Sequence, residues 1–456
     1  MVAITVQVPA ELRPNSNTPI TNFDHNQMAW SSVTTCTVMK GRANAKRILE
    51  AFRNVVHKNP LLAGRLVDVG EDGELRVEIT LSDATLGCCF EEVELSSEHE
   101  ATAQRVTADA HAVVAHAVEL KDLFRALQLP EPGSGFDQLQ KNLPLAFCTV
   151  YQGQELSLLC LSVSHIIGDG FTYYELLKAL DNEYSKPGSS KPLQGRDTVD
   201  AGIASIMSTY TAEEKHAQSE FFPRMYMENI KNRDLAKCHE VRLMLPVHVL
   251  EAMKAAVTQK HPQQIISKQD VLSSWIASQV GAEFVSYVVN IRGRSPVVAP
   301  RSMSNAEMIW YAKASGSKDD GDDVEGPFKA ADMRASIKTC GAHTQFTLAA
   351  GSKCAKHPAA VIGTNSWIKV QHLPRFGGQA GIHVPVYTWE SLPVVFRTVS
   401  NLLYAVNETD YVLHQWGLDC AQADKLEKAW RSLGVETITR LTGTTVLQRT
   451  ARVTTD

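Results

Sequence analysis

The alternation of apolar and polar residues predicts that strands and helices interleave along the whole chain. Residues 144–151 and 155–165 are predicted to be two strands, because apolar side chains recur with a period of two and a Gln-Gly-Gln turn separates them. In residues 43–57 the apolar side chains recur at helical spacing, with Lys and Arg on the opposite face. Residues 267–280 repeat the helical pattern, and residues 283–294 read as a strand that runs into arginines. Strands and helices in both halves favour a mixed α/β protein.

Length and one polar stretch predict two domains. The chain has 456 residues, more than a single ordinary core holds. Residues 183–200 are rich in Pro, Gly, Ser and charge, and they are the best candidate for a connection. We therefore predict an N-terminal domain over residues 1–190, a crossover linker and helix over 191–235, and a C-terminal domain over 236–456.

Composition and charge narrow the class of protein. The formal net charge is -5, so no strong positive field attracts nucleic acid or an anionic membrane. The nine cysteines are scattered, with no CxxC pair or zinc-type Cys/His spacing, which indicates reduced buried thiols and no metal site. The N-terminus lacks a secretory signal pattern, and no apolar run approaches the length of a membrane span. We expect a cytoplasmic protein without a nucleic-acid partner.

Residues 162–170, Ser-Val-Ser-His-Ile-Ile-Gly-Asp-Gly, carry the strongest candidate for chemistry. His165 is the last residue of the core-facing row of the second strand, and Gly168 and Gly170 leave room for close approach of a ligand. An imidazole in this position can act as a general base, ligate a metal or simply pack. The stretch offers at most two metal ligands, and the common hydrolase, P-loop and metalloprotease signatures are absent, so the base and packing interpretations remain.

His165, Asp169 and Gly170 also match a known signature: the stretch resembles the HxxxDG motif of the BAHD acyltransferases, within the chloramphenicol-acetyltransferase-like superfamily. Other landmarks of that family follow in the same order, and the resemblance extends from about residue 20 to about residue 430. The further segments that are similar to the family are ITNFDH at 20–25, HKNPLLAGRL at 57–66, the segment 288–307 and the segment 364–381.

One segment departs from the family pattern. The family's DFGWG loop is replaced by Arg375-Phe376-Gly377-Gly378-Gln379, which lacks both the aspartate and the tryptophan. Because the loop is regarded as structural in the family, the resemblance does not make the chemistry depend on it.

The resemblance implies both a fold and an activity. The fold is two chloramphenicol-acetyltransferase-like domains, each a mixed β-sheet flanked by helices, with the active-site channel at their interface, in a monomer. The activity is transfer of an acyl group from a coenzyme A thioester to a hydroxyl or amine of a small molecule. Acyl-CoA is then a co-substrate, and no cofactor is bound permanently. Acetyl, malonyl, hydroxycinnamoyl and fatty acyl donors all occur in the family.

The resemblance also assigns roles at the motif. His165 is the general base that takes the proton of the acceptor, a role that contributes about 10²–10⁴-fold, and no covalent acyl-enzyme is required. Asp169 pairs with an arginine, with Arg292 as first choice and Arg294 as second, and Gly170 leaves room for the thioester. A catalytic dyad of Asp169 and His165 is the alternative.

Other residues are assigned to the substrates. Trp367 and Asn365 stand where the family has Thr-Ser-Trp, and both can donate a hydrogen bond to an oxyanion; the alternative for Trp367 is simple packing. On the first strand, the alternate residues Ser32, Thr34 and Cys36 would line the acceptor channel, and ordinary strand packing is the alternative for most of them.

Two other functions fit the same resemblance. A condensation-type acyltransferase takes its acyl group from a carrier protein, and turnover of free acyl-CoA distinguishes it from the first interpretation. A catalytically silent member keeps the fold as a binding protein, and it would bind acyl-CoA without transferring the acyl group.

Overall fold

The computed structural model describes most of the chain in thirteen stretches. They are residues 31–68, 75–79, 81–130, 132–193, 199–212, 215, 233–282, 284–294, 297–313, 330, 361–378, 381–387 and 397–453. The segment 20–25, much of the predicted linker 191–235 and Gln379 lie outside the described residues.

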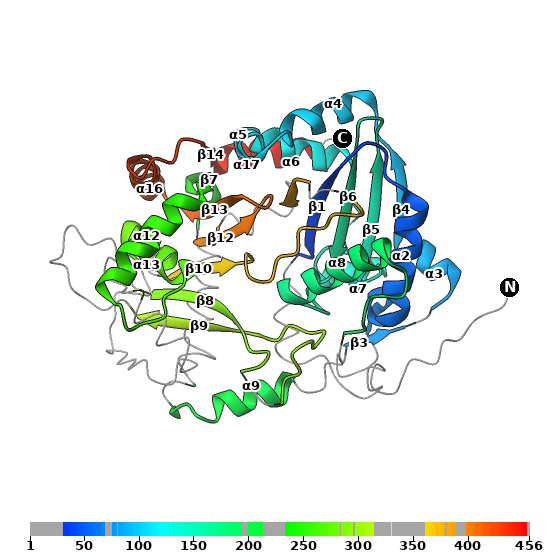
Figure 1. The fold of residues 1–456 in the computed structure, drawn as a ribbon, viewed down its shortest axis with the longest axis horizontal. Helices are drawn as coiled ribbons and strands as arrows, with labels where there is room; N and C mark the ends of the chain where they lie inside the picture. Colours follow the sequence, from blue (N-terminus) through cyan, green and yellow to red (C-terminus); the bar gives the residue numbers. More distant parts are fainter. Residues whose placement is uncertain are drawn as a thin grey trace.

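Four strands from the first half of the chain and one from the second form a five-stranded mixed sheet, on the right in Figure 1. In spatial order its strands are β11 (His383–Pro385), β1 (Val33–Lys40), β6 (Leu156–Val163), β5 (Ala146–Gln152) and β4 (Phe90–Glu94). Only the β5–β4 pair among them is parallel. A two-stranded ribbon of β2 (Arg65–Asp68) and β3 (Leu75–Glu78) lies apart from it. The two strands predicted before the histidine are therefore confirmed as β5 and β6.

The second half builds a seven-stranded mixed sheet. In spatial order its strands are β14 (Ile438–Thr442), β7 (His239–Pro246), β13 (Asp410–Leu418), β12 (Ser400–Ala405), β10 (Val361–Ser366), β8 (Phe284–Asn290) and β9 (Glu307–Lys313). The β10 strand runs parallel to both neighbours, whereas the other pairs are antiparallel.

Helices cover the first sheet, and their apolar side chains pack against the apolar side chains of its strands. The helices of this half are α2 (Ala45–Lys58), α3 (Asp83–Gly87), α4 (Ser97–Val106), α5 (Ala110–Ala115), α6 (Ala117–Ala126), α7 (Gly135–Lys141) and α8 (Gly170–Ser185), with the short helix η2 (Pro60–Ala63). Phe52 of α2 and Leu177 of α8 share a core with Leu159, Leu161 and Val163 of β6. The predicted core-facing row is thus confirmed for these three residues of β6, whereas His165, predicted as its last member, lies beyond the end of the strand.

The second sheet has its own helical layer. The remaining helices are α9 (Val199–Met207), α12 (Val247–Lys260), α13 (Lys268–Val280), α16 (Cys420–Ser432) and α17 (Gly443–Val453), with the short helix η4 (Leu235–Lys237). Trp275 of α13 and Trp430 of α16 pack with ring centroids 4.2 Å apart, in a core that includes Val241 and Leu413 of the sheet.

The two halves are joined by elements that cross between them. β11, from the second half, pairs with β1 of the first sheet, and the backbone N–H of His383 also donates to Val406 beyond β12. A further core places Cys36 and Leu158 of the first sheet with Leu402 and Trp416 of the second, beside α4, α5 and α6 (Figure 1). The predicted domain boundaries near residues 190 and 235 stay a prediction. The first sheet contains β11 from the second half of the chain, and the second sheet packs against helices α4, α5 and α6 from the first half.

A buried ion pair adds to this junction. Lys121 of α6 binds Glu240 of β7 at 2.7 Å, and both side chains are almost fully inaccessible. His414 of β13 lies 2.6 Å from the same carboxylate through Nε2. Among the helices that the structure describes, none has the length and apolar character that a membrane crossing requires.

Candidate active site

The predicted catalytic stretch forms a tight turn between β6 and α8. β6 ends at Val163, His165 lies in the turn, and α8 begins at Gly170. Asp169 caps the helix, because its Oδ1 accepts a hydrogen bond of 2.9 Å from the backbone N–H of Thr172. A side chain at Gly168 would overlap Thr172, with a Cβ 2.4 Å from its methyl carbon, so this position requires glycine.

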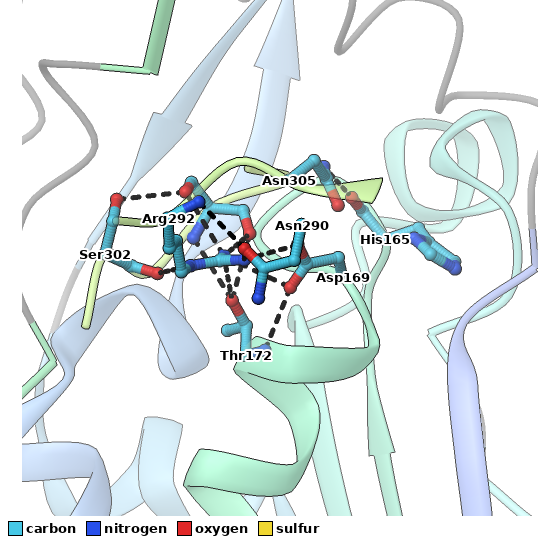
Figure 2. A network of polar contacts seen from close by, with 8 residues as sticks. His165, Asp169, Thr172, Asn290, Arg292, Ser302 and Asn305 are labelled. Atoms are coloured by element: carbon cyan, nitrogen blue, oxygen red, sulfur yellow. Dashed lines mark hydrogen bonds and ion pairs between the residues drawn. The ribbon is translucent and has the colours of Figure 1, made fainter. Parts of the chain in front are cut away.

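Asp169 and Arg292 form a bidentate ion pair between the two halves. Arg292 Nη1 lies 2.7 Å from Oδ2 of Asp169, and Nη2 lies 3.2 Å from Oδ1 (Figure 2). Each side chain is only 2% exposed. Further guanidinium contacts go to the carbonyl oxygens of Ser302 and Ser304 and to the side-chain oxygens of Asn290 and Thr172. The charge is therefore both paired and hydrogen-bonded. The structure therefore brings together the pair that the resemblance implied.

Phe171 and Glu307 are two further neighbours that affect the charge environment of this ion pair. The guanidinium carbon of Arg292 lies 4.5 Å above the ring of Phe171, a cation–π contact. Burial, together with the charge of Asp169, raises the pKa of Glu307 to about 8. At neutral pH Glu307 is therefore protonated, and Asp169 is the single anion that Arg292 must balance in this group.

His165 points away from the ion pair. Figure 2 shows its imidazole directed to the side opposite Arg292, while its backbone carbonyl accepts a 2.5 Å hydrogen bond from Nδ2 of Asn305. The imidazole is half-buried, and its Nδ1 atom is buried without a hydrogen bond to any residue that the structure describes. Because Asp169 is engaged by Arg292 and Thr172, this geometry favours a structural role for Asp169 over a dyad with His165.

Burial sets the protonation of His165. It lowers the pKa of the imidazole below its ordinary value, while the charge of Asp169 and the side chain of Asn305 oppose that shift. A neutral imidazole at physiological pH is the form that can accept a proton.

Trp367 covers the first residue of α8. The indole Nε1 would lie 3.1 Å from a Cβ built on Gly170, so the glycine lets the indole approach the turn that carries His165. The ring of Trp367 also meets the ring of Tyr174 edge-on, with centroids 5.7 Å apart. No hydrogen bond is made by the indole N–H within the described part of the chain, which leaves this donor available.

The other predicted substrate residues differ in their surroundings. Asn365 lies on β10, two residues before Trp367, and is half-buried. Ser32 is also half-buried, and its hydroxyl donates to the carbonyl of Gly133 at 2.9 Å. Thr34 and Cys36 are buried on β1, where Thr34 bonds a serine of β6 and Cys36 joins an apolar core. Their burial favours strand packing over contact with a substrate for these two residues.

The loop that departs from the family pattern is held by a side chain from elsewhere. Asp181 of α8 accepts hydrogen bonds from the backbone N–H groups of Arg375 (3.1 Å) and Phe376 (2.7 Å), and from Nε2 of His372 (2.9 Å). Although burial opposes the shift, these bonds lower the pKa of Asp181. Gly377 adopts φ +80°, which glycine allows at no steric cost. An aspartate outside the loop thus stabilises the loop.

A second network missed by sequence reasoning lies beneath Trp367. His383 of β11 is fully buried; its Nδ1 lies 2.9 Å from the hydroxyl of Thr37, and its Nε2 lies 3.4 Å from that of Tyr174. Burial lowers the pKa of His383 to about 3, so it is neutral. No sequence signal marked His383, because its partners come from β1 and α8, more than 200 residues away. Asn305 was contained in the similar segment 288–307 but was not singled out.

Metal ligands are not gathered at this site. Within the stretches that the structure describes, no group of three or more His, Cys, Asp or Glu side chains is placed to hold a metal ion.

Comparison with solved structures identifies the fold. TRI101 of F. sporotrichioides, in a complex with coenzyme A and T-2, is 13% identical over 91% of this chain and 97% of that chain, with a TM-score of 0.57. Vinorine synthase is 14% identical over 93% and 95%, with a TM-score of 0.57. The first condensation domain of the CDA synthetase is 14% identical over 91% and 96%, also with a TM-score of 0.57.

No family model matches the sequence, and no curated protein sequence matches it. The likeness is therefore one of fold, and the expected chloramphenicol-acetyltransferase-like fold with mixed sheets flanked by helices is confirmed.

Proposed function

We propose that the protein is an acyltransferase that moves an acyl group from a coenzyme A thioester to a hydroxyl or amine of a small molecule. The observation that carries the proposal is the placement of His165: a half-buried, neutral imidazole on a turn that the Asp169–Arg292 ion pair braces at the junction of the two halves. The fold shared with TRI101, which was crystallised with coenzyme A, supports the choice of donor.

The proposed step needs one proton carrier. His165 takes the proton of the acceptor hydroxyl or amine as its oxygen or nitrogen attacks the thioester carbonyl carbon. The resulting tetrahedral intermediate carries a negative oxygen. When the carbon–sulfur bond breaks, the electron pair leaves with sulfur, and the imidazolium returns the proton to the thiolate. The products are the ester or amide and free coenzyme A, with no covalent acyl-enzyme.

The intermediate needs a hydrogen-bond donor for its oxygen. The indole N–H of Trp367 lies over Gly170, on the turn that carries His165, and has no partner among the described residues. Asn365, on the preceding strand β10, offers a side-chain amide. We assign the oxyanion to Trp367 first and to Asn365 second. The enzyme is proposed to be monomeric and cytoplasmic, as the sequence predicts.

The decisive experiment measures release of coenzyme A thiol. Purified wild type, His165→Ala and His248→Ala are each given a set of acyl-CoA thioesters with a panel of alcohols and amines. His248 is exposed at the start of α12 and serves as the matched control. We expect acceptor-dependent release by wild type and His248→Ala, and a loss of about 10²–10⁴-fold in folded His165→Ala. Release that His165→Ala leaves unchanged would contradict the proposed base.

Condensation domains among the structural neighbours support a second candidate, an acyltransferase fed by a carrier protein. The same assay separates the two when carrier-bound acyl groups are supplied beside acyl-CoA. Transfer from the carrier alone favours this candidate. Binding of acyl-CoA without transfer from either donor favours the silent binding protein.

A further inference from the structure

We propose that Asn305 is a positioning residue for His165: its side-chain oxygen accepts the Nδ1–H of the imidazole and leaves Nε2 free to take the proton of the acceptor. This inference rests on the proposed function for its kinetic consequence. Its structural content, the tautomer of His165, can be measured without any turnover.

Two orphaned atoms carry the inference. Nδ1 of His165 and Oδ1 of Asn305 are both buried, and neither has a hydrogen-bond partner in the part of the chain that the structure describes. A buried polar atom without a partner is costly because it has lost its hydrogen bonds to water, so two such atoms on adjacent side chains are expected to pair with each other. Burial of Nδ1 also means that Nε2 is the ring nitrogen that a substrate can reach.

The orientation of the amide is set by its other end. Asn305 Nδ2 donates to the backbone carbonyl of His165 itself, and a carbonyl can only accept. The amide oxygen is therefore the atom left to face the imidazole, and no flip of the side chain offers an equivalent pair. Asn305 is 2% exposed, so water does not compete freely for that oxygen.

The electrostatics of His165 agree with the contact. The Asn305 side chain raises the pKa of the imidazole against the lowering by burial. No hydrogen bond between the two atoms is formed among the described contacts, and catalytic hydrogen bonds often tighten only when substrate binds. Asp169 is the charged group that acts on His165, and its charge is held by Arg292, while the raised pKa of Glu307, about 8, keeps that carboxyl mostly protonated at pH 7.

The pairing has a mechanistic consequence. With Nδ1 protonated and bonded to Asn305, Nε2 carries the lone pair in every molecule. After Nε2 takes the acceptor proton, the Nδ1–H remains bonded to the amide oxygen, so the ring does not rotate while it holds the proton. Without Asn305 the neutral imidazole divides between two tautomers, of which only one is a base at Nε2.

The first test is a nitrogen-15 NMR spectrum of the histidine side chains at pH 7.5, with His165→Ala to assign the signal. We expect His165 to be the Nδ1–H tautomer in wild type and a mixture of tautomers in Asn305→Ala. A wild-type His165 in the Nε2–H form would overturn the proposal. Because this measurement needs no substrate, it separates failure of this inference from failure of the proposed acyltransferase activity.

The second test compares the pH dependence of turnover below pH 8 in Asn305→Ala, Asn305→Asp and Asn401→Ala. Asn401 is the matched control: it is 2% exposed, its Nδ2 donates to the carbonyl of Gly363 at 3.1 Å, and its Oδ1 has no partner among the described residues. It lies on β12, in register with β10 and β13.

Asn305→Ala is expected to lower kcat by about tenfold or more with little change in KM, and to move the acid limb of the profile to lower pH. Asn305→Asp moves the limb to higher pH, because a carboxylate favours the imidazolium. Asn401→Ala leaves the limb in place. If Asn305→Ala loses stability as Asn401→Ala does but keeps the wild-type acid limb, Asn305 has only a structural role and the proposal fails. If Asn305→Ala does not fold, the direction in which Asn305→Asp moves the acid limb decides the question.

Discussion

The carboxylate of Asp169 and the guanidinium of Arg292 join the two halves of the molecule at the base of the catalytic turn. Two parallel contacts of 2.7 and 3.2 Å link the cap of α8 to the chain that follows β8. The turn that carries His165 therefore keeps its shape only while the second half is folded against the first. If His165 acts as the proposed base, activity and assembly of the two halves are coupled through this pair.

Asp169→Asn tests that coupling. The substitution preserves a good helix cap but leaves Arg292 buried without its counter-charge, so we expect a loss of about 3–5 kcal/mol in the free energy of unfolding, measured with urea. Asp109→Asn is the matched control, because Asp109 caps α5 at 2.8 Å from an exposed position and has no ion pair among the described contacts. We expect that control to stay within about 0.5 kcal/mol of wild type. Equal effects of the two variants would show that the ion pair adds nothing to the cap.

Gly170→Ala tests the approach of the indole. The new methyl group would lie 3.1 Å from Nε1 of Trp367, so the ring must move by a few tenths of an ångström. Alanine is favourable for the helix itself, by about 0.5–1 kcal/mol, so we expect reduced kcat in a protein that remains folded. Gly87→Ala is the control, since nothing lies within 4 Å of its Cβ position at the end of α3. Unchanged kcat in Gly170→Ala would separate Trp367 from the site.

Trp367→Phe tests the proposed oxyanion donor. Loss of one such donor costs about 2.7–4 kcal/mol, which corresponds to about 10²–10³ in kcat. Tyr174→Phe is the comparison, because it keeps the ring that packs on Trp367 at 5.7 Å and removes only the hydroxyl near His383. We expect a much smaller loss of kcat in Tyr174→Phe. Similar losses in both variants, with steady-state kinetics at saturating donor, would assign Trp367 a packing role.

His383 predicts acid sensitivity of the fold. The pKa of His383 is about 3 in the folded protein, below its ordinary value near 6.5. Between pH 3 and pH 6.5 the imidazole is therefore protonated in the unfolded chain but neutral in the folded protein. Stability is therefore lost as pH falls from about 6.5 towards 3, by about 1.4 kcal/mol per pH unit from this residue. In urea titrations at stepped pH, His383→Asn should flatten the slope by that amount. His57→Asn, at an exposed position, is the control variant, and an unaltered slope in His383→Asn would refute the assignment.

The hydrogen bonds from the backbone of Arg375 and Phe376 to Asp181 are expected to hold this loop in its conformation. Asp181→Ala leaves two backbone N–H groups without their acceptor, and each buried unpaired donor costs about 1–3 kcal/mol. We expect lower stability and faster cleavage of the loop by limited proteolysis. Glu175→Ala, on the same helix, is the control. Cleavage at equal rates in both variants would show that the loop is held by other contacts.

Local pattern was enough to predict the elements around the site. The period of two in residues 144–151 and 155–165 and the helical period in residues 43–57 and 267–280 are confirmed as β5, β6, α2 and α13. Each of these elements buries one apolar face, so apolar residues recur in the sequence with the period of a strand or of a helix. The resemblance in the residues from His165 to Gly170 added the fold, which the comparisons with solved structures confirm.

The local pattern of apolar and polar residues could not predict contacts between residues that are far apart in the sequence. The sequence by itself determined which segments are strands and helices and, through the resemblance, named Arg292 as the partner of Asp169. It placed His165 at the end of a strand that stops two residues earlier, at Val163. Only the tertiary structure brought Asn305 to His165, Asp181 to the loop at Phe376, and His383 to Thr37 and Tyr174. Periodicity records which face of an element is buried, whereas the partner of a buried polar atom depends on how segments more than a hundred residues apart meet in space.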